Sequence, residues 1–494
     1  MISIFVDSLG RIPILNGNTI RAVEPQKDYW VKVIDYDGTI IDERGLNNGD
    51  EYALPGAPSH EGITFDGWVA SEQIINNTVT CNNNNIMIGA RYKTTSGLNE
   101  FDIELTKATG KTIDFLMTGN KNWGDGTTDS ATSHTYTSYG KYTITCDGGT
   151  LPSYVFNQSS GHYNYTCVNV RLSLVNISAS NIFRYCYNLK TAIIDKRNTV
   201  GLQDAFRDCK NLQAYVYHNI YSGSYGLTNS GIKSVVIPYG RTAIGQGEFS
   251  GCSKLENIVL PSTLLSMSYL GLYGLSNLKN NLKIPNSVVF PTVFNEEVLG
   301  RIADINVELP NTITLIPEYL FTEAKISSIS IPDTVETIKG YAFYSCSNLT
   351  ELKFPSGISH IGSAIGATFQ GCSNILLYDF SEATAVPTLE GYGNFAGINP
   401  LCRIVVPDSL YNSWIAASGW SEYSNYIYRA SDVFNNIWWM FCKSLTFGGI
   451  KMPLVKSASK KAFQKNVKEE LNAGKSKKQA VAIAYSVQRQ ARKK

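Results

Sequence analysis

The residues of this chain that could carry chemistry are few, and their spacing matches no catalytic or metal-binding motif. The 494 residues include five histidines and ten cysteines. None of the histidines falls in an H-E-x-x-H or zinc-finger spacing; they are His60, His134, His162, His218 and His360. The sequence also offers no Gly-x-Ser-x-Gly elbow between a strand and a helix and no glycine loop suited to a phosphate. We therefore expect a protein without enzymatic activity, cofactor or metal.

Five cysteines share one repeated frame, with a phenylalanine three positions before each of them. The pairs are Phe183 and Cys186, Phe206 and Cys209, Phe249 and Cys252, Phe343 and Cys346, and Phe369 and Cys372. Degenerate copies of the frame begin at Leu227, Leu272, Leu299, Phe321 and Phe395. The mean period is about 24 residues, and a period of about 20 to 29 residues is typical of a leucine-rich-repeat solenoid.

A second frame supports the solenoid, because most units run into a short apolar strand that ends in proline. These prolines include Pro238, Pro261, Pro332, Pro355 and Pro407. Proline cannot donate to a strand ladder, so it ends each strand at the same height in the stack. The expected fold class is mainly β: a solenoid of about ten coils of about 24 residues, preceded by two small β domains and followed by a short α-helical basic tail.

The repeat cysteines could be metal ligands, disulfide partners or core residues. One cysteine per coil would form a buried column with a spacing of about 4.7–4.9 Å, where a free thiol behaves as a small hydrophobic group. Four other units carry Leu275, Ile302, Ala324 and Ile398 at the same position, and a ligand position would not accept them. We therefore interpret the Phe and Cys positions as the structural core of the repeat.

The Phe-x-x-Cys-Ser-x-Leu and Ile-Pro-x-x-Val-x-x-Ile-x-x-x-Ala-Phe frames, clearest from Pro332 to Leu349, resemble the BspA-like family of leucine-rich repeats. This family occurs on surface proteins of anaerobic and parasitic microbes. The resemblance covers about residues 175–432 and implies an adhesin or attachment module. We assign residues 151–182 to a connector and N-terminal cap, 183–406 to the solenoid and 407–432 to a C-terminal cap.

The first of the two small β domains is expected at residues 29–95. Its Tyr36-Asp-Gly turn, Gly62-x-x-Phe-x-Gly-Trp68 and Ala90-x-Tyr92 resemble the internalin-type B repeat, a β-grasp-like spacer of bacterial surface proteins. Trp68 is expected to anchor the domain core, and a ligand-binding role is the alternative. Residues 1–28 are strand-like and could form an attachment element.

The second small domain is expected at residues 96–150. Trp123-Gly-Asp-Gly, followed by His134-x-Tyr and Gly140-x-Tyr, resembles the PKD-type immunoglobulin-like fold. Asp125 and Gly126 suit a tight hairpin turn. Asp125 and Asp129 supply two carboxylates, fewer than a calcium site of six or more oxygens requires. We therefore expect Trp123, Asp125 and Gly126 to be structural.

The formal net charge of +2 conceals a basic tail. Residues 452–494 contain 12 Lys and Arg against 2 Asp and Glu, and they resemble small basic proteins of tailed phages. Two short helices are expected there, at 460–471 and 477–489. Nucleic acid or another anion could bind this tail, and a solvated appendage is the alternative; the candidate residues are Lys460, Lys461, Lys475, Lys477 and Lys478. Residues 433–451 form an aromatic linker.

These features predict a non-enzymatic surface recognition or attachment protein. The sheet of proline-terminated strands would bind a bacterial surface glycan or protein, and exposed positions expected beside it are Ser234, Asn257, Ser328, Glu351 and Arg403. The longest apolar runs are about six residues, whereas a membrane span needs about 20, so we expect no membrane-spanning segment.

The N-terminus lacks a basic start, an apolar stretch and a cleavage site. Together with the phage-like tail, this favours a virion fibre or decoration protein that contacts other virion proteins. A bacterial cell-surface adhesin and a purely structural virion component are the alternatives.

Overall fold

The computed structural model describes residues 12–16, 19–23, 27–147, 150–156, 166–173, 176–177, 180–197, 203–220, 223–291 and 297–434. The chain divides into two compact units, residues 1–376 with 387–400 and residues 377–386 with 401–494. Most of the aromatic linker lies outside the described residues. So does the whole basic tail, with Lys460, Lys461, Lys475, Lys477 and Lys478.

The first unit begins with a small β domain. A separate hairpin, β1 (Ile12–Asn16) with β2 (Thr19–Val23), precedes it. The main sheet has the order β4-β3-β8-β6, and its strands are β3 (Tyr29–Ile34), β4 (Ile40–Leu46), β6 (Ile63–Ala70) and β8 (Ile86–Thr94). A second pair joins β5 (Glu51–Ala53) to β7 (Thr78–Thr80). Side chains alternate along a strand, so Val31 and Val33 enter the domain core while Ile34 and Met87 belong to a cluster on the other face.

The next domain is joined to the solenoid by a continuous sheet. Its strands are β9 (Asn99–Leu105), β10 (Thr112–Asp114), β11 (Lys121–Asn122), β12 (Thr128–Asp129), β13 (Ser133–Thr135) and β14 (Gly140–Cys146). The sheet runs β12-β11-β14-β9 and then continues into β16 (Cys167–Leu172) and β18 (Thr191–Ile194) of the solenoid. A short parallel pair, β15 (Thr150–Leu151) with β17 (Asn176–Ile177), lies in the connector.

Residues 151–182 take part in this continuous sheet. We expected that segment to be a connector and N-terminal cap; its strand β16 pairs antiparallel with β9 and parallel with β18. The edge of the solenoid sheet is therefore closed by β9 of the preceding domain. Pairing an edge strand satisfies its backbone groups and protects it from other chains. Arg171 reinforces the junction, because its guanidinium binds Glu100 at 2.7 Å and Asp102 at 2.8 Å.

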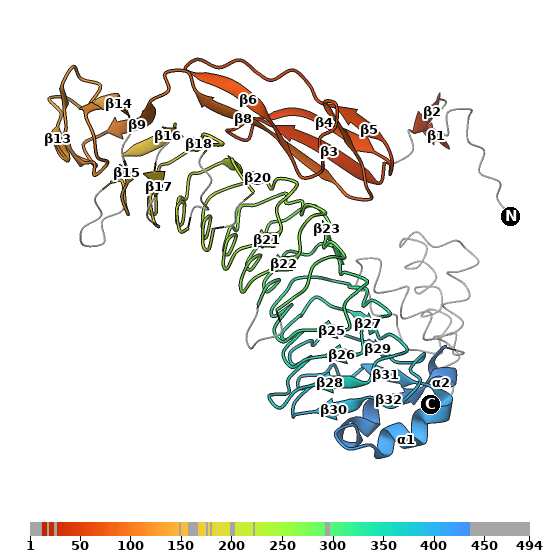
Figure 1. The fold of residues 1–494 in the computed structure, drawn as a ribbon. Coiled ribbons are helices and arrows are strands. Elements are labelled where there is room, and N and C mark those ends of the chain that lie inside the picture. Colours follow the sequence, from red (N-terminus) through yellow and green to blue (C-terminus); the bar gives the residue numbers. More distant parts are fainter. Residues whose placement is uncertain are drawn as a thin grey trace, which may run out of the picture. The chain divides into compact units, whose positions relative to one another are not determined.

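The solenoid is built from two ladders of short parallel strands (Figure 1). The first ladder, the lateral sheet, contains in this unit β18, β19 (Ala214–Val216), β20 (Ser234–Val236), β23 (Leu282–Lys283), β24 (Val307–Glu308) and β27 (Glu351–Lys353). Proline follows the last four of these strands after one further residue. The second ladder contains β21 (Ala243–Ile244), β22 (Ser266–Met267), β25 (Leu315–Ile316), β26 (Thr337–Ile338), β28 (His360–Gly362) and β30 (Thr388–Glu390). The fold is mainly β with a solenoid of about 11 turns, which confirms the expected fold class.

The repeat phenylalanines form a stacked column in the core. Phe321 and Phe343 lie 5.3 Å apart with an interplanar angle of 11°, and Phe343 and Phe369 lie 5.7 Å apart at 16°. The turn that carries each phenylalanine needs left-handed backbone on both sides of it. Tyr341 and Ser345 supply this in one coil, each with φ of 55°. Glycine adopts such φ values without strain and other residues rarely do, so the stack holds these turns in place.

The second unit is a small β structure with a helical cover. Its strands are β29 (Leu377–Asp379), β31 (Arg403–Val406) and β32 (Ile427–Arg429), and its helices are η1 (Asp408–Leu410), α1 (Tyr411–Ala416), η2 (Ser421–Tyr426) and α2 (Ala430–Phe434). Helix α1 lies within residues 407–432, which we assigned to a C-terminal cap. Trp414 and Trp420 are fully buried against Phe380, at 5.3 and 5.5 Å between rings.

Candidate binding surface

The first coils of the lateral sheet are covered by the small domain at residues 29–95. Their outward side chains Ile193, Val216, Val236 and Val259 form what we call the covered face. Val236 and Val259 are buried in one apolar cluster with residues of β3, β6 and β8, and Ile193 is buried in another with residues of β6 and β8. Two sheets thus pack face to face, with β6 and β8 beside β18 and β20 in Figure 1.

Close approach of the two sheets depends on Gly89 of β8. A Cβ atom at this position would lie 2.6 Å from Val216 Cγ2 and 3.0 Å from Val236 Cγ2. Glycine inside a strand often marks such an approach of another backbone. The domain therefore packs directly against the solenoid.

Polar contacts surround this apolar contact. The Tyr239 amide donates to the Ala70 carbonyl at 2.7 Å, and the Lys283 ammonium donates to the Asn83 carbonyl at 2.7 Å. The Ser262 hydroxyl donates to Glu72 at 3.3 Å, and burial raises the pKa of that carboxyl. The covered face leaves only the later coils of the lateral sheet accessible to a ligand. Ser234, one of the positions expected beside the binding surface, is half-buried in β20, a covered strand.

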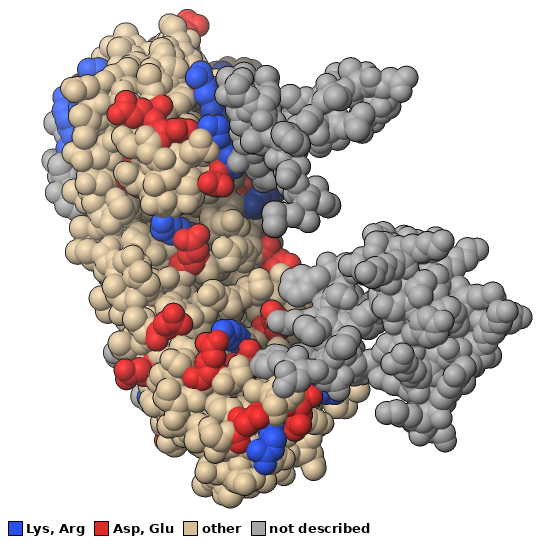
Figure 2. Space-filling model, turned by 90° about the vertical axis from the view of Figure 1, so that its right-hand side faces the viewer, with Lys and Arg blue, Asp and Glu red and all other residues tan. Residues whose placement is uncertain are grey.

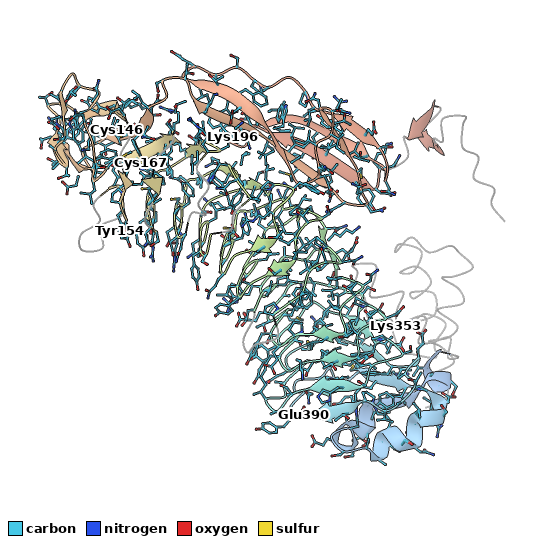
Figure 3. All side chains as sticks on the ribbon, viewed as in Figure 1. Cys146, Tyr154, Cys167, Lys196, Lys353 and Glu390 are labelled. Carbon is cyan, nitrogen blue, oxygen red and sulfur yellow. The ribbon has the colours of Figure 1, made fainter. Side chains whose placement is uncertain are left out.

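The later coils of the first unit carry polar side chains at the same outward position. Lys283, Glu308, Ser330 and Lys353 continue the column of Val236 and Val259. Lys283 still contacts the covering domain, so we call Glu308, Ser328, Ser330 and Lys353 the open face. Glu308, Ser328, Ser330 and Lys353 are exposed. Figure 3 places Lys353 on this side of the solenoid and Glu390, from the second ladder, on another. In Figure 2 acidic and basic side chains are interspersed on the side shown.

The other expected positions are less accessible. Asn257 and Glu351 are half-buried within the lateral sheet. Arg403 belongs to the second unit, where its guanidinium lies 4.9 Å from the ring centre of Tyr428. Of the five positions only Ser328 is exposed.

In the turn that follows Trp123 of the second domain, the polar side chains bond to neighbouring residues of the same domain. The Asp125 carboxylate accepts from the Thr127 amide at 3.0 Å and lies 2.8 Å from His134 Nε2. The hydrogen bond from the Thr127 hydroxyl, aided by His134, lowers the pKa of Asp125 to about 2. Trp123 is buried and donates its indole N–H to Asp129 at 2.9 Å. Gly126 has φ of 95°, as the turn requires.

The repeat cysteines are buried, and their thiols have a polar partner that the sequence did not reveal. Cys209 and Cys372 donate to the carbonyl of the phenylalanine one coil earlier, at 3.2 and 3.0 Å. Cys346 makes the same contact to Phe321 at 3.0 Å. Burial raises the pKa of the Cys252 thiol to about 11. A thiol held protonated is a poor nucleophile and a poor metal ligand. Every cysteine in the described ranges is free.

A buried ion pair in the solenoid is also absent from any sequence pattern. The Arg241 guanidinium donates to both oxygens of Glu248, and the Tyr217 hydroxyl donates to the same carboxylate. Both charged side chains are at most 1% exposed. Their neighbours in sequence gave no reason to expect a charge inside a coil.

The repeats agree with a family model. The model for the BspA type leucine-rich repeat region matches six copies, over residues 134–213, 218–297 and 301–413, which is more than half of the chain. The chain belongs to this family. The BspA type match begins inside the second domain, consistent with the sheet that joins that domain to the first coils.

Solved leucine-rich repeat structures are similar to this BspA type chain at low identity. A leucine-rich repeat protein from Bacteroides ovatus is 16% identical, with 60% of this chain and 90% of that chain covered and a TM-score of 0.34. A leucine rich cell surface protein from Faecalibacterium prausnitzii is 17% identical, with 57% and 87% covered and a TM-score of 0.28. A leucine-rich repeat protein from Eubacterium ventriosum is 19% identical, with 60% and 78% covered and a TM-score of 0.34. The comparison with curated proteins finds no match.

Two further features bear on the site. Within the described ranges, no helix has the length and apolar character needed to cross a bilayer. In the same ranges, no three or more His, Cys, Asp or Glu side chains gather as a metal site would require.

Proposed function

We propose that this BspA type protein is a non-enzymatic recognition module that binds a bacterial surface glycan or protein through its open face. The observation that carries the proposal is the change of side-chain character along one column. Where a domain covers the column, it carries Val236 and Val259. Beyond that domain the same position carries Glu308, Ser330 and Lys353, which are exposed. A broad polar sheet on a rigid scaffold suits a partner with many hydroxyl or charged groups.

The family and the cell surface protein from Faecalibacterium prausnitzii support display outside a cell. The resemblance of residues 452–494 to small phage proteins supports the finer proposal, a virion fibre or decoration protein. In that case the basic tail would bind an anionic partner, nucleic acid included, or another virion protein. A bacterial cell-surface adhesin is the second candidate.

The test uses the full chain, because removing residues 29–95 would expose the covered face and cause non-specific sticking. Ser328→Arg with Ser330→Arg blocks the open face with two bulky side chains. The matched control, Thr314→Arg with Ser359→Arg, adds the same charge at exposed positions directly before β25 and β28 of the second ladder. Binding of the labelled proteins to intact cells of a panel of bacterial strains is measured by flow cytometry.

The proposal expects binding to at least one strain, an apparent affinity at least ten times weaker for the open-face variant, and unchanged binding for the control. Equal loss in both variants, or no loss in either, would contradict this placement. Peptide mass spectrometry of purified virus particles and of shaved cell surfaces then separates the virion protein from the adhesin.

A further inference from the structure

A groove opens where the first small domain meets the solenoid. We call it the interdomain groove. One wall comes from the end of β6, the segment after it and Arg91 of β8, and the other from residues 196, 217–220 and 238–239. Its volume of about 480 Å³ falls within the range of about 300–1,000 Å³ that is usual for small-molecule sites, which often lie between domains. Figure 3 marks Lys196 at this junction.

Aromatic and apolar side chains line part of both walls. Trp68 contributes from β6, where its ring also packs on Phe65 with 5.2 Å between centres. Tyr239 contributes from the solenoid and is 37% exposed, and Ile220 beside it is 48% exposed. Trp68 therefore packs against the domain core and also lines the groove.

Both cations that line the groove are paired with a carboxylate next to it. Arg91 and Lys196 both face Asp66, which is not itself in the lining, at 3.6 and 3.2 Å, and the carboxyl of the lining belongs to the buried Glu72. The Arg91 Nε is buried and has no hydrogen-bond partner, although its Nη2 donates to the Asp66 carbonyl at 3.1 Å. Asp66 offsets the charge of the two cations and Glu72 adds a carboxyl, so no strong field of one sign remains in the groove.

Asn219 is positioned by a buried histidine. His218 is 4% exposed; its Nε2 lies 2.8 Å from the Asn219 amide nitrogen and its Nδ1 lies 3.0 Å from the Tyr215 hydroxyl. An amide nitrogen can only donate, so His218 Nε2 accepts and Nδ1 carries the proton. The chain of contacts fixes the Asn219 amide at the edge of the groove.

We propose that the interdomain groove binds a short neutral saccharide. A pyranose ring has a C–H face that packs on aromatic rings such as Trp68 and Tyr239, and a rim of hydroxyls that both donate and accept hydrogen bonds. The side-chain amides of Asn219 and Gln73 can donate and accept hydrogen bonds, and the guanidinium of Arg91 can donate them. The balanced charges favour a neutral sugar over an anionic one. The site is separate from the open face, so it goes beyond the proposed function and does not depend on it.

The test measures saccharide binding by the full chain with saturation-transfer NMR and calorimetry. The probes are glucose, galactose, mannose and N-acetylglucosamine, each also as its β-1,4-linked trisaccharide, with sialyllactose as the anionic probe. We expect at least one neutral probe to bind. Tyr239→Ala and Asn219→Ala should each weaken that binding at least tenfold, whereas Tyr392→Ala, at an 80% exposed tyrosine outside the groove, should leave it unchanged.

Several outcomes would overturn the proposal. They are the absence of binding by every neutral probe, tighter binding of sialyllactose than of any neutral probe, and undiminished binding by both groove variants. The open-face variant with Ser328→Arg and Ser330→Arg should bind the saccharide normally. Its behaviour separates failure of this site from failure of the proposed function.

Discussion

The carboxylate of Glu248 is the counter-ion of Arg241, whose charge is fully buried in the solenoid. Glu248 accepts hydrogen bonds from Arg241, Tyr217 and the Gly245 amide. Glu248→Gln would leave the Arg241 charge buried without its counter-ion, which typically costs about 3–5 kcal/mol. We expect that loss in urea unfolding of the full chain followed by fluorescence. The double variant Arg241→Met with Glu248→Leu removes both charges and should lose much less; equal losses would mean that packing, and not the charge, decides.

The burial of His218 leads us to expect that the stability of the protein changes with pH. Burial lowers its pKa from 6.5 to about 4. The folded protein therefore keeps this imidazole neutral while the unfolded chain takes up a proton below pH 6.5. Stability from this group is complete above pH 6.5 and is lost as the pH falls towards 4, by up to about 3 kcal/mol. Urea unfolding at pH 7.5 and 4.5 measures the loss. In His218→Gln the dependence should be smaller by that amount, and an unchanged dependence would exclude His218 as its source.

At the scale of elements, the contact between two sheets depends on the missing side chain of Gly89. Gly89→Leu would place atoms where the methyl groups of Val216 and Val236 now lie, so the domain should separate from the covered face. Hydrogen exchange at β19 and β20 should then rise at least tenfold. Gly56→Leu is the control, because a Cβ there meets nothing within 4 Å. Unchanged exchange in Gly89→Leu would show that the sheets are not held by this contact.

The solenoid could be predicted from the sequence because each coil repeats the same inward residues, and stacking gives every copy the same partners. The covered face left a weaker signal. Val-Val-Ile before Pro238 and Ile-Val-Leu before Pro261 are continuous apolar runs, whereas Glu-Leu-Lys-Phe before Pro355 alternates. Continuous runs are typical of strands buried on both faces, so a partner sheet was implied there, but nothing in the runs says which sheet.

The interdomain groove could not be predicted in the same way. Its walls join residues near 68–91 to residues near 196–239, and no period relates the two segments. Similarly, closure of the first coil by β9 depends on pairing between residues 99–105 and 167–172. No sequence pattern links these two segments. Contacts between non-repeated segments are set by the docked surfaces, and those surfaces have no repeat to reveal them.

At the scale of the whole molecule, the division into two compact units predicts that they lose structure independently. The second unit is small and relies on a few large side chains, of which Trp414 and Trp420 are fully buried. Repeat proteins do not require every part to unfold together, since each repeat depends mainly on its neighbours. A change in the core of the second unit should therefore act mainly on that unit.

Trp420→Ala tests this independence. Removing a buried tryptophan costs about 3–5 kcal/mol, because it leaves a cavity beside Phe380 and Trp414. Hydrogen exchange should accelerate in β31 and β32, while β19 and β20 of the first unit keep their protection. Glu422→Ala, at an exposed position of η2, serves as the control and should change neither. If Trp420→Ala accelerated exchange equally in both units, the chain would unfold as one cooperative body, and the saccharide and open-face variants would then need stability measurements before their binding could be compared.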